Sequence, residues 1–335
     1  MKVLLVVLPG GKPWNGATLY QEGLGGSESA VAYLARALFR KGNEVTVATH
    51  GTAGVFDGVK YVNQQDLDQL IIQPWHVMIS SRWLEALTWP WQNMLKIFWT
   101  HDLPHVAQPS IAAHRAVCLT DYHRESWHLG EDVCSIIGNG VDTSLFSGPA
   151  LVRNTNVLIW TSNPERGLPI AARIFQEIRK RWPEMELHVY GRSSIYGWGP
   201  GDPGLEGPYL PRAQHMENIF LHEPLNKVGL AKVLREAWAW FYPSWWPETY
   251  CIAALEAQAA GTPVISVPLA GLKETVHGGV LQWDFLNAVS QLRNRSKWEK
   301  ESKSAKEFAF QQDWDLIADQ WLRMIENALP KPGVS

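Results

Sequence analysis

Short runs rich in Val, Ile and Leu alternate with helix-like segments along almost the whole of this 335-residue chain. Such alternation is typical of α/β proteins, in which a helix crosses back between parallel strands. A chain of this length exceeds one comfortable core and fits two α/β domains. We therefore expect two parallel sheets covered by helices, rather than a β-sandwich or a helix bundle.

The first series of expected strands occupies the amino-terminal half of the chain. These strands cover residues 3–8, 44–49, 76–80, 96–100, 116–119 and 134–137. Between the first two, Val31, Leu34, Ala35 and Leu38 recur at the spacing of one helix face, and Gly42 suits the helix end. The pattern predicts an amphipathic crossover helix at this place.

A second series of expected strands follows in the carboxyl-terminal half. These strands cover residues 156–160, 186–190, 219–222, 239–242 and 263–267. The turn-rich sequence Gly-Asn-Gly-Val-Asp at 138–142 separates the two series, and we expect the hinge there. The predicted domains are residues 1–147 and 148–311, followed by an amphipathic helix at about 312–330.

Charge and cysteine content exclude several classes of protein. The chain has 30 Lys and Arg against 33 Asp and Glu, and neither half carries a basic excess, which disfavours nucleic-acid partners and charge-driven membrane binding. The three cysteines form no C-x-x-C motif and fit a reducing compartment better than a disulfide framework or a zinc site. No apolar run approaches the roughly 20 residues that span a bilayer. We expect a cytoplasmic protein whose membrane association is at most peripheral.

A glycine-rich turn at residues 23–26 stands directly before the first expected helix. Exposed backbone N–H groups and the helix dipole favour an anion at such a turn. A dinucleotide fingerprint would need the turn directly after the strand, a third glycine in place of Glu28, and an acidic residue closing the second strand, and none is present. We interpret Gly25 and Gly26 as contacts to phosphate or sugar. The alternative is a flexible loop with an ordinary helix cap.

Polar residues follow two further strands at their carboxyl ends. His101 and Asp102 come directly after the strand at 96–100, and Arg166 lies in a short loop after the strand at 156–160. Ligands of open α/β sheets bind at this edge, so we expect His101 and Asp102 to face a ligand. Arg166 beside a helix start suits a diphosphate. The alternatives are a structural histidine and a surface arginine.

The most informative segment is residues 243–265. A strand ends near Tyr242, a loop carries Glu248, a helix starts around Tyr250, and Glu256 lies eight residues after Glu248. At roughly 1.5 Å rise per residue this spacing is about 12 Å at most, comparable with the reach from a donor sugar across a pyrophosphate to a ribose. The segment is therefore suited to a nucleotide sugar.

The start of this helix offers a second kind of contact. Backbone N–H groups there would meet the phosphates between the two carboxylates. The residues that provide them are Thr249, Tyr250 and Cys251. Glu256 falls among apolar neighbours on the helix, and its burial would be costly without a hydrogen-bonding ligand or partner.

Taken in order, these motifs resemble glycosyltransferase family 4, the retaining transferases of the GT-B fold. The resemblance covers nearly the whole chain. It rests on the Gly-Gly loop, His101-Asp102-x-Pro104, residues 138–142, Pro164-x-Arg166-Gly167, and the Glu248-x7-Glu256 signature with its Gly-x-Pro-Val tail. It implies an α/β fold of two Rossmann-like domains facing each other across a cleft, with the final helix packing back on the first domain.

The resemblance also assigns roles to residues. It implies that Glu248 contacts hydroxyls of the transferred sugar, that Glu256 contacts the ribose, and that His101 lies beside the donor sugar. The diphosphate would be held by Gly25, Gly26 and Arg166. Many relatives carry a Lys a few positions after the arginine, whereas this chain has Leu-Pro-Ile at 168–170. Arg192 is our candidate for the missing cation.

The function that the resemblance implies is hexosyl transfer from a UDP- or GDP-sugar to a saccharide or lipid-linked acceptor, as in polysaccharide biosynthesis. The expected reaction retains the anomeric configuration and needs no metal and no cofactor beyond the nucleotide sugar. The catalytic candidates are His101, Glu248 and Arg166. The two D-x-D sequences, at residues 66–68 and 313–315, fall on expected helices away from this site.

Two other functions remain open at this stage. A nucleotide-sugar epimerase, or a phosphorylase, would keep the fold and change the reaction. A non-catalytic nucleotide-sugar-binding subunit would keep the site without turnover. An NAD-dependent dehydrogenase is disfavoured, because the dinucleotide fingerprint is absent.

Overall fold

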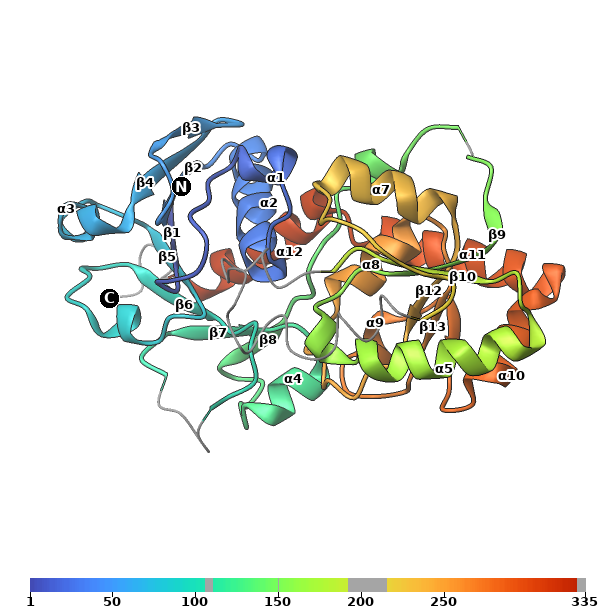
Figure 1. The fold of residues 1–335 in the computed structure, drawn as a ribbon. Helices are drawn as coiled ribbons and strands as arrows, with labels where there is room; N and C mark the ends of the chain where they lie inside the picture. The colour runs from blue at the N-terminus through green and yellow to red at the C-terminus, as the bar shows by residue number, and fades with distance from the viewer. Residues whose placement is uncertain (106–110, 150, 192–215, 330–335) are drawn as a thin grey trace. The chain divides into compact units, whose positions relative to one another are not determined.

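The computed structural model describes residues 1–105, 111–149, 151–191 and 216–329. The chain divides into two compact units. The first comprises Met1–Leu19, Leu24–Gly140 and Trp314–Ser335, and the second comprises Tyr20–Gly23 and Val141–Asp313. Each unit contains one sheet of mainly parallel strands with helices packed on it (Figure 1).

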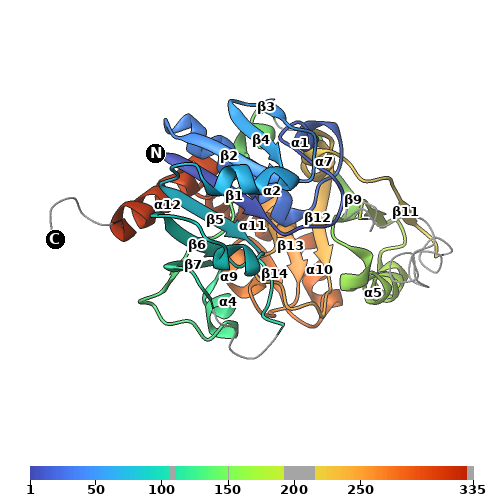
Figure 2. The same cartoon turned by 90° about the vertical axis from the view of Figure 1, so that its left-hand side faces the viewer.

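The sheet of the first unit has eight strands in the order β3-β4-β2-β1-β5-β6-β7-β8. Their bounds are β1 Lys2–Val7, β2 Glu44–Thr49, β3 Gly54–Phe56, β4 Val59–Asn63, β5 Val77–Ser81, β6 Leu95–Trp99, β7 Arg115–Cys118 and β8 Cys134–Ile136. Only the β3–β4 pair is antiparallel among the described pairings. Strands β5, β6 and β7 lie side by side in Figure 2. Their carboxyl ends therefore meet at one edge.

The helices of this part of the chain are α1 Thr18–Gln21, α2 Gly26–Arg40, α3 Leu67–Ile71, α4 Asp121–Ser126 and α12 Trp314–Ala328, with 3₁₀ turns η1 Gln64–Asp66 and η2 Glu85–Thr88. Helix α12 packs against α2, and the ring of Trp314 stacks on that of Tyr33 at a centroid distance of 6.0 Å. Trp321 is fully buried against Trp99, with ring centroids 5.0 Å apart. The apolar stripe of α12 thus completes the core of the first unit.

The sheet of the second unit has six parallel strands in the order β11-β10-β9-β12-β13-β14. Their bounds are β9 Asn154–Trp160, β10 Glu186–Val189, β11 Ile219–Leu221, β12 Ala237–Tyr242, β13 Val264–Ser266 and β14 Gly279–Leu281. Strand β12 is buried along its whole length. A central parallel strand covered on both faces is expected to be continuously apolar, as β12 is.

The helices of the second unit are α5 Leu168–Arg181, α7 Lys227–Glu236, α8 Ile252–Ala259, α9 Leu272–Thr275, α10 Phe285–Arg293 and α11 Arg295–Phe310, with 3₁₀ turns η3 Thr143–Phe146 and η4 Pro164–Arg166. Arg153 connects the start of β12 to the loop between α8 and β13, because its Nη1 donates to the carbonyl oxygen of Ala237 at 2.7 Å and to Thr262 Oγ1 at 2.8 Å. Burial lowers the pKa of Arg153 to about 10, so the guanidinium stays charged at neutral pH.

Every strand that the sequence predicted is present, with small shifts at the ends. The α/β class is therefore confirmed. Strands β3, β4 and β14 were not predicted. Along the described ranges, no helix combines the length and the apolar character that crossing a bilayer requires.

Candidate functional site

In the second unit, the loops after β9 and β12 leave the sheet side by side, because these two strands are parallel neighbours. The first loop ends in Gly167, whose φ of 139° favours glycine. A Cβ on Gly167 would lie 3.0 Å from the carbonyl oxygen of Pro243 in the second loop. Ser244 Oγ then donates to the carbonyl oxygen of Arg166. This close backbone packing brings Arg166 beside the loop that carries Glu248.

Glu248 is buried, with 4% of the residue exposed. Arg166 Nη1 donates to its Oε1 and Oε2, at 3.0 Å each, and Tyr242 OH donates to Oε1 at 2.5 Å. Burial, and secondarily the charge of Glu248, raise the pKa of Tyr242 well above its ordinary value, so the phenol remains a donor. Two charge-assisted donors therefore fix the orientation of this carboxylate.

Arg166 also contacts an aromatic ring. Its Cζ lies 5.3 Å from the ring centroid of Trp246, within the range of a cation–π interaction. The side chain of Arg166 is 31% exposed, compared with 6% for Glu248. The guanidinium is thus held between a buried acid and an exposed ring while part of it remains accessible to an anion.

Helix α8 begins at Ile252, later than the sequence predicted, because Cys251 adopts a left-handed conformation with φ of 74°. Among the described residues no side chain caps this helix start. Burial raises the pKa of the Cys251 thiol well above its ordinary value, and the nearby Glu248 charge raises it further. The thiol is therefore neutral and unsuited to act as a nucleophile.

The loop after β13 closes over the residues before α8. Gly271 N–H donates to the carbonyl oxygen of Glu248 at 2.9 Å. A Cβ at Gly271 would lie 2.7 Å from the carbonyl oxygens of Glu248 and Thr249, so a larger residue would displace this loop. Thr275 Oγ1 donates to the carbonyl oxygen of Tyr250, and burial raises the pKa of the Tyr250 phenol. These contacts hold the backbone around Thr249 and Tyr250 in place.

Glu256 lies on α8 and has 7% of its surface exposed. The partner that its burial requires is Lys227, the first residue of α7, whose Nζ donates to Oε1 at 2.5 Å. The two side chains are 12% and 9% exposed. Lys227 was missed from the sequence because it lies 29 residues before Glu256 on a different helix, and no local motif connects the two.

In the first unit, the predicted glycines stand at the start of α2. Gly25 occupies the N-cap position and Gly26 is the first helical residue. The carbonyl oxygen of Gly25 accepts from Ser29 N–H at 2.9 Å, and no described side chain caps the helix. Glu28 lies in the first turn. The turn therefore has the helix-start geometry expected of an anion contact, although an acidic side chain stands next to it.

His101 follows β6 at the carboxyl edge of the same sheet. It is 7% exposed, has a left-handed backbone with φ of 56°, and its ring centroid lies 4.2 Å from that of Trp99. Burial, followed by the charges of Arg82 and His123, lowers the pKa of His101 well below 6.5. The imidazole is therefore neutral at physiological pH.

Arg82 is a charged residue of this edge that the sequence analysis missed. It follows β5 with a left-handed φ of 65°. Its Nε donates to Asp102 Oδ2 at 2.5 Å, and its Nη1 donates to Ser27 Oγ at 3.0 Å and to Glu28 Oε1 at 3.4 Å. One guanidinium thus links the start of α2 to the ends of β5 and β6.

Some of the predicted site residues contact one another, and one lies outside the described residues. The structure pairs Arg166 with Glu248 in the second unit. Arg192 lies outside the described residues. Within the described ranges, no three His, Cys, Asp or Glu side chains gather as a metal site would require. In the second D-x-D sequence, Asp313 precedes α12 and its Oδ2 accepts from Thr143 Oγ1 at 2.5 Å, which indicates a structural role.

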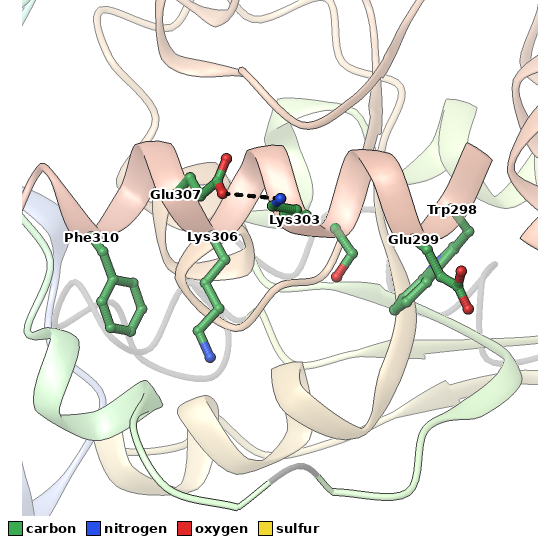
Figure 3. Close-up of a pocket in the computed structure, with 7 residues that line it drawn as sticks. Trp298, Glu299, Lys303, Lys306, Glu307 and Phe310 are labelled. Carbon is green, nitrogen blue, oxygen red and sulfur yellow. Dashed lines mark ion pairs between the residues drawn. The ribbon is translucent and has the colours of Figure 1, made fainter. Parts of the chain in front are cut away.

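A hollow of about 450 Å³ lies along α11 (Figure 3). Its lining residues are Trp298, Glu299, Ser302, Lys303, Lys306, Glu307 and Phe310. Lys303 Nζ lies 3.7 Å from Glu307 Oε1, and both side chains are well exposed. None of the residues predicted for the site lines this hollow. Long exposed charged chains from one helix offer no fixed, converging donors, so we do not regard it as the functional site.

Comparison with known proteins gives a match in the second unit. Residues 155–295 match the family model described as "Glycosyl transferases group 1", a range that includes Arg166, Glu248 and Glu256. A D-inositol 3-phosphate glycosyltransferase from Kribbella flavida is 31% identical over 179 residues, covering 49% of this chain and 40% of that protein. A phosphatidyl-myo-inositol mannosyltransferase from Mycobacterium tuberculosis is 24% identical over 219 residues, covering 59% of this chain and 55% of that protein. The chain spans about half the length of these relatives.

Solved structures match nearly the whole chain. The sucrose-phosphate synthase of Thermosynechococcus elongatus aligns with a TM-score of 0.73 and 16% identity over 98% of this chain and 99% of that one. AviGT4, a glycosyltransferase of avilamycin A biosynthesis, gives a TM-score of 0.69, with 17% identity and 98% of each chain covered. Anabaena HepE in complex with UDP-glucose gives 0.71, with 16% identity over 97% and 99% of the two chains. At these identities the likeness shows the fold, and the GT-B fold class is confirmed.

Proposed function

We propose that this protein is a glycosyltransferase that moves a sugar from a nucleoside diphosphate sugar to an acceptor hydroxyl. The observation that carries the proposal is the arrangement around α8. A buried carboxylate, Glu248, is oriented by Arg166 and Tyr242 just before the uncapped start of the helix, and a second buried carboxylate, Glu256, is the fifth residue of the helix. The match over residues 155–295 and the likeness to HepE with bound UDP-glucose support the same assignment.

Each group in this arrangement has a chemical role in the proposal. The fixed Glu248 carboxylate accepts hydrogen bonds from hydroxyls of the donor sugar. Arg166 and the N–H groups at the start of α8 stabilise the charge that develops on the leaving diphosphate. Glu256 accepts from ribose hydroxyls. Tyr242, which stays protonated, keeps the Glu248 oxygens aimed in one direction.

We further propose that the reaction proceeds with retention of anomeric configuration and without a metal. The acceptor hydroxyl would attack on the face that the diphosphate leaves, and its proton would pass to the leaving phosphate oxygen. Cys251 is no candidate for a covalent intermediate, because its buried thiol stays neutral. The guanidinium and the helix start would meet the diphosphate charge in place of a cation. Gly25, Gly26 and His101 stay predictions as donor contacts.

The donor and the acceptor are narrower proposals. We expect a UDP- or GDP-sugar as donor and no other cofactor. The relatives are named for inositol phosphate and phosphatidylinositol acceptors, so a polyol, saccharide or lipid-linked acceptor is proposed, with a role in glycan biosynthesis. Three buried free cysteines fit a cytoplasmic location.

The first experiment is a thermal-shift screen of the wild-type protein with UDP-, GDP-, ADP- and dTDP-sugars. At a ligand concentration about 100 times Kd, binding stabilises the folded protein by about 2.7 kcal/mol, which is a shift of several degrees. The same donor should give a much smaller shift with Glu256→Gln. If no nucleotide sugar shifts the melting temperature, the proposed function is wrong.

The second experiment identifies the reaction of the donor that binds. The products formed with and without candidate acceptors are examined by NMR, which reads the anomeric configuration directly. A new glycoside with the donor's configuration supports the proposal. An inverted product would contradict retention, and an isomerised sugar nucleotide formed from donor alone would identify an epimerase.

A further inference from the structure

Lys227 and Glu256 form a buried ion pair in the second unit. In the proposed donor site Glu256 binds the ribose, but Lys227 has no role so far. Lys227 begins α7, and Glu256 lies on α8, so the pair joins two helices of the second unit. Both side chains are almost fully removed from water, at 12% and 9% exposure. Burying an ammonium and a carboxylate costs desolvation energy that their attraction often fails to recover. Two apolar side chains would hold α7 on α8 at least as well.

The position of the lysine is fixed by its backbone and its burial. Asn226 caps α7 through Oδ1, which accepts from Gly229 N–H at 2.9 Å, so the helix start that carries Lys227 is well defined. The Nζ then donates to Glu256 Oε1 at 2.5 Å. An ammonium has three donors and a carboxylate has two acceptor oxygens, so the pair retains further capacity of both kinds. Donor and acceptor thus lie side by side.

This combination matches a vicinal diol. A hydroxyl can donate to the carboxylate while its own oxygen, or that of the neighbouring hydroxyl, accepts from the ammonium. We propose that Lys227 is a donor-binding residue which, together with Glu256, recognises the 2′- and 3′-hydroxyls of the nucleotide ribose. The inference rests on the proposed function, because it places the ribose at Glu256.

The charges around α8 favour the same conclusion. Glu248 has Arg166 as its cation and Glu256 has Lys227, so each acid is neutralised before a ligand arrives. Without Lys227, a diphosphate would approach a site with one uncompensated carboxylate, which would oppose binding. Lys227 therefore supplies a second cation, at the ribose end of the site.

The test uses calorimetry with the nucleoside diphosphate that the wild-type protein binds best, and with its 2′-deoxy and 3′-deoxy counterparts. Removing one hydroxyl should weaken wild-type binding by about 10- to 100-fold, as expected for a hydrogen bond to charged groups. Lys227→Met should weaken binding of the parent nucleotide by a similar factor. In this variant the penalty should fall below about threefold for the deoxy counterpart that lacks the hydroxyl bonded to Lys227, because that hydroxyl has already lost its ammonium partner, whereas Glu256 keeps its own contact.

Three further variants separate ligand recognition from folding. Lys232→Met, at an exposed position of the same helix, should bind like wild type. Lys227→Met combined with Glu256→Gln removes both buried charges and keeps a binding measurement possible if the single variant unfolds. The exchange Lys227→Glu with Glu256→Lys retains an ion pair between the helices but reverses the positions of the ammonium and the carboxylate. This variant should fold normally but bind the ribose poorly.

The outcomes distinguish the inference from the function on which it rests. If the wild-type protein binds none of the nucleoside diphosphates, the proposed function fails and the inference fails with it. If the wild-type protein binds one, and Lys227→Met or the exchanged pair keeps both the parent affinity and the full deoxy penalty, then Lys227 is only a bridge between helices and the inference is wrong.

Discussion

The carboxyl edges of the two sheets hold their charged residues in different ways. At the edge of the second unit, the carboxylates of Glu248 and Glu256 are 6% and 9% exposed, and each is bonded to a cation. At the edge of the first unit, the side chains are more open: Arg82 is 28% exposed, and its partners Glu28 and Asp102 are 27% and 42% exposed.

This difference in burial predicts that removing a charged residue has a larger effect in the second unit than in the first. Water and salt screen charges at a half-exposed edge, so such pairs contribute about 0–1 kcal/mol each. Charges inside a poorly solvated site interact more strongly, and removing one partner leaves the other unpaired. The second unit should therefore tolerate loss of a cation far less than the first. The predictions below test this contrast, beginning with the largest expected effect.

Arg166→Ala should lower kcat/KM for the donor by at least about 100-fold, because it leaves Glu248 without its cation and, under the proposed function, removes a charged hydrogen-bond donor from the leaving diphosphate. Arg82→Ala should lower it by less than about tenfold, in keeping with weaker electrostatics at an exposed edge. Steady-state kinetics measures both. Arg173→Ala, at an exposed position of α5, is the matched control. Equal losses in the Arg166 and Arg82 variants would remove the contrast between the two edges.

The first unit also contains a fully buried titratable residue, His123, whose ring contacts the backbone of Asp102. Burial lowers the pKa of His123 to about 4, and the unfolded value is 6.5. Its Nδ1 accepts from Leu119 N–H at 3.2 Å, so the proton lies on Nε2, which donates to the carbonyl oxygen of Asp102 at 2.8 Å. The folded state therefore holds a neutral ring in a hydrogen-bonded position.

Below pH 6.5 the unfolded chain binds a proton at His123 that the folded chain does not, so stability is complete above this pH and decreases as pH falls towards 4. The free energy of unfolding should drop by about 1.5 kcal/mol between pH 6.5 and 5 from His123 alone. Urea titrations at several pH values measure the drop. His123→Gln should reduce it, whereas His128→Asn, at an exposed position, should leave it unchanged. A pH-independent wild-type stability in this range would contradict a neutral buried ring.

The smallest effect is expected for the stability of the exposed edge itself. Arg82→Met should cost about 0.5–1 kcal/mol at low ionic strength and less in 1 M salt, because the lost pairs to Glu28 and Asp102 are partly solvated. The left-handed backbone imposes a similar strain on either residue, so the comparison isolates the charge. Lys60→Met, at an exposed position of β4, serves as the control. A loss of several kcal/mol would show that this edge is as strongly coupled as the other.

Local sequence was sufficient for the architecture and for part of the site. The strands and the helices α2 and α12 follow from apolar periodicity, which acts over a few neighbouring residues. Glu248 and Glu256 could be placed at the two ends of one loop-helix segment, because both lie within a single motif. The sequence also indicated that Glu256 needs a partner, because its neighbours on the helix are apolar and an unpaired buried charge is costly.

The tertiary structure determined which distant residues contact the two glutamates and which contact the start of α2. Lys227 reaches Glu256 only because α7 packs on α8, and Arg166 reaches Glu248 only because Gly167 permits the loops after β9 and β12 to touch. Arg82 reaches the start of α2 through the order of strands in its sheet. Periodicity and motif spacing describe neighbours along the chain, whereas these contacts join residues far apart in sequence, and only the packing of the whole sheet brings them within hydrogen-bonding distance.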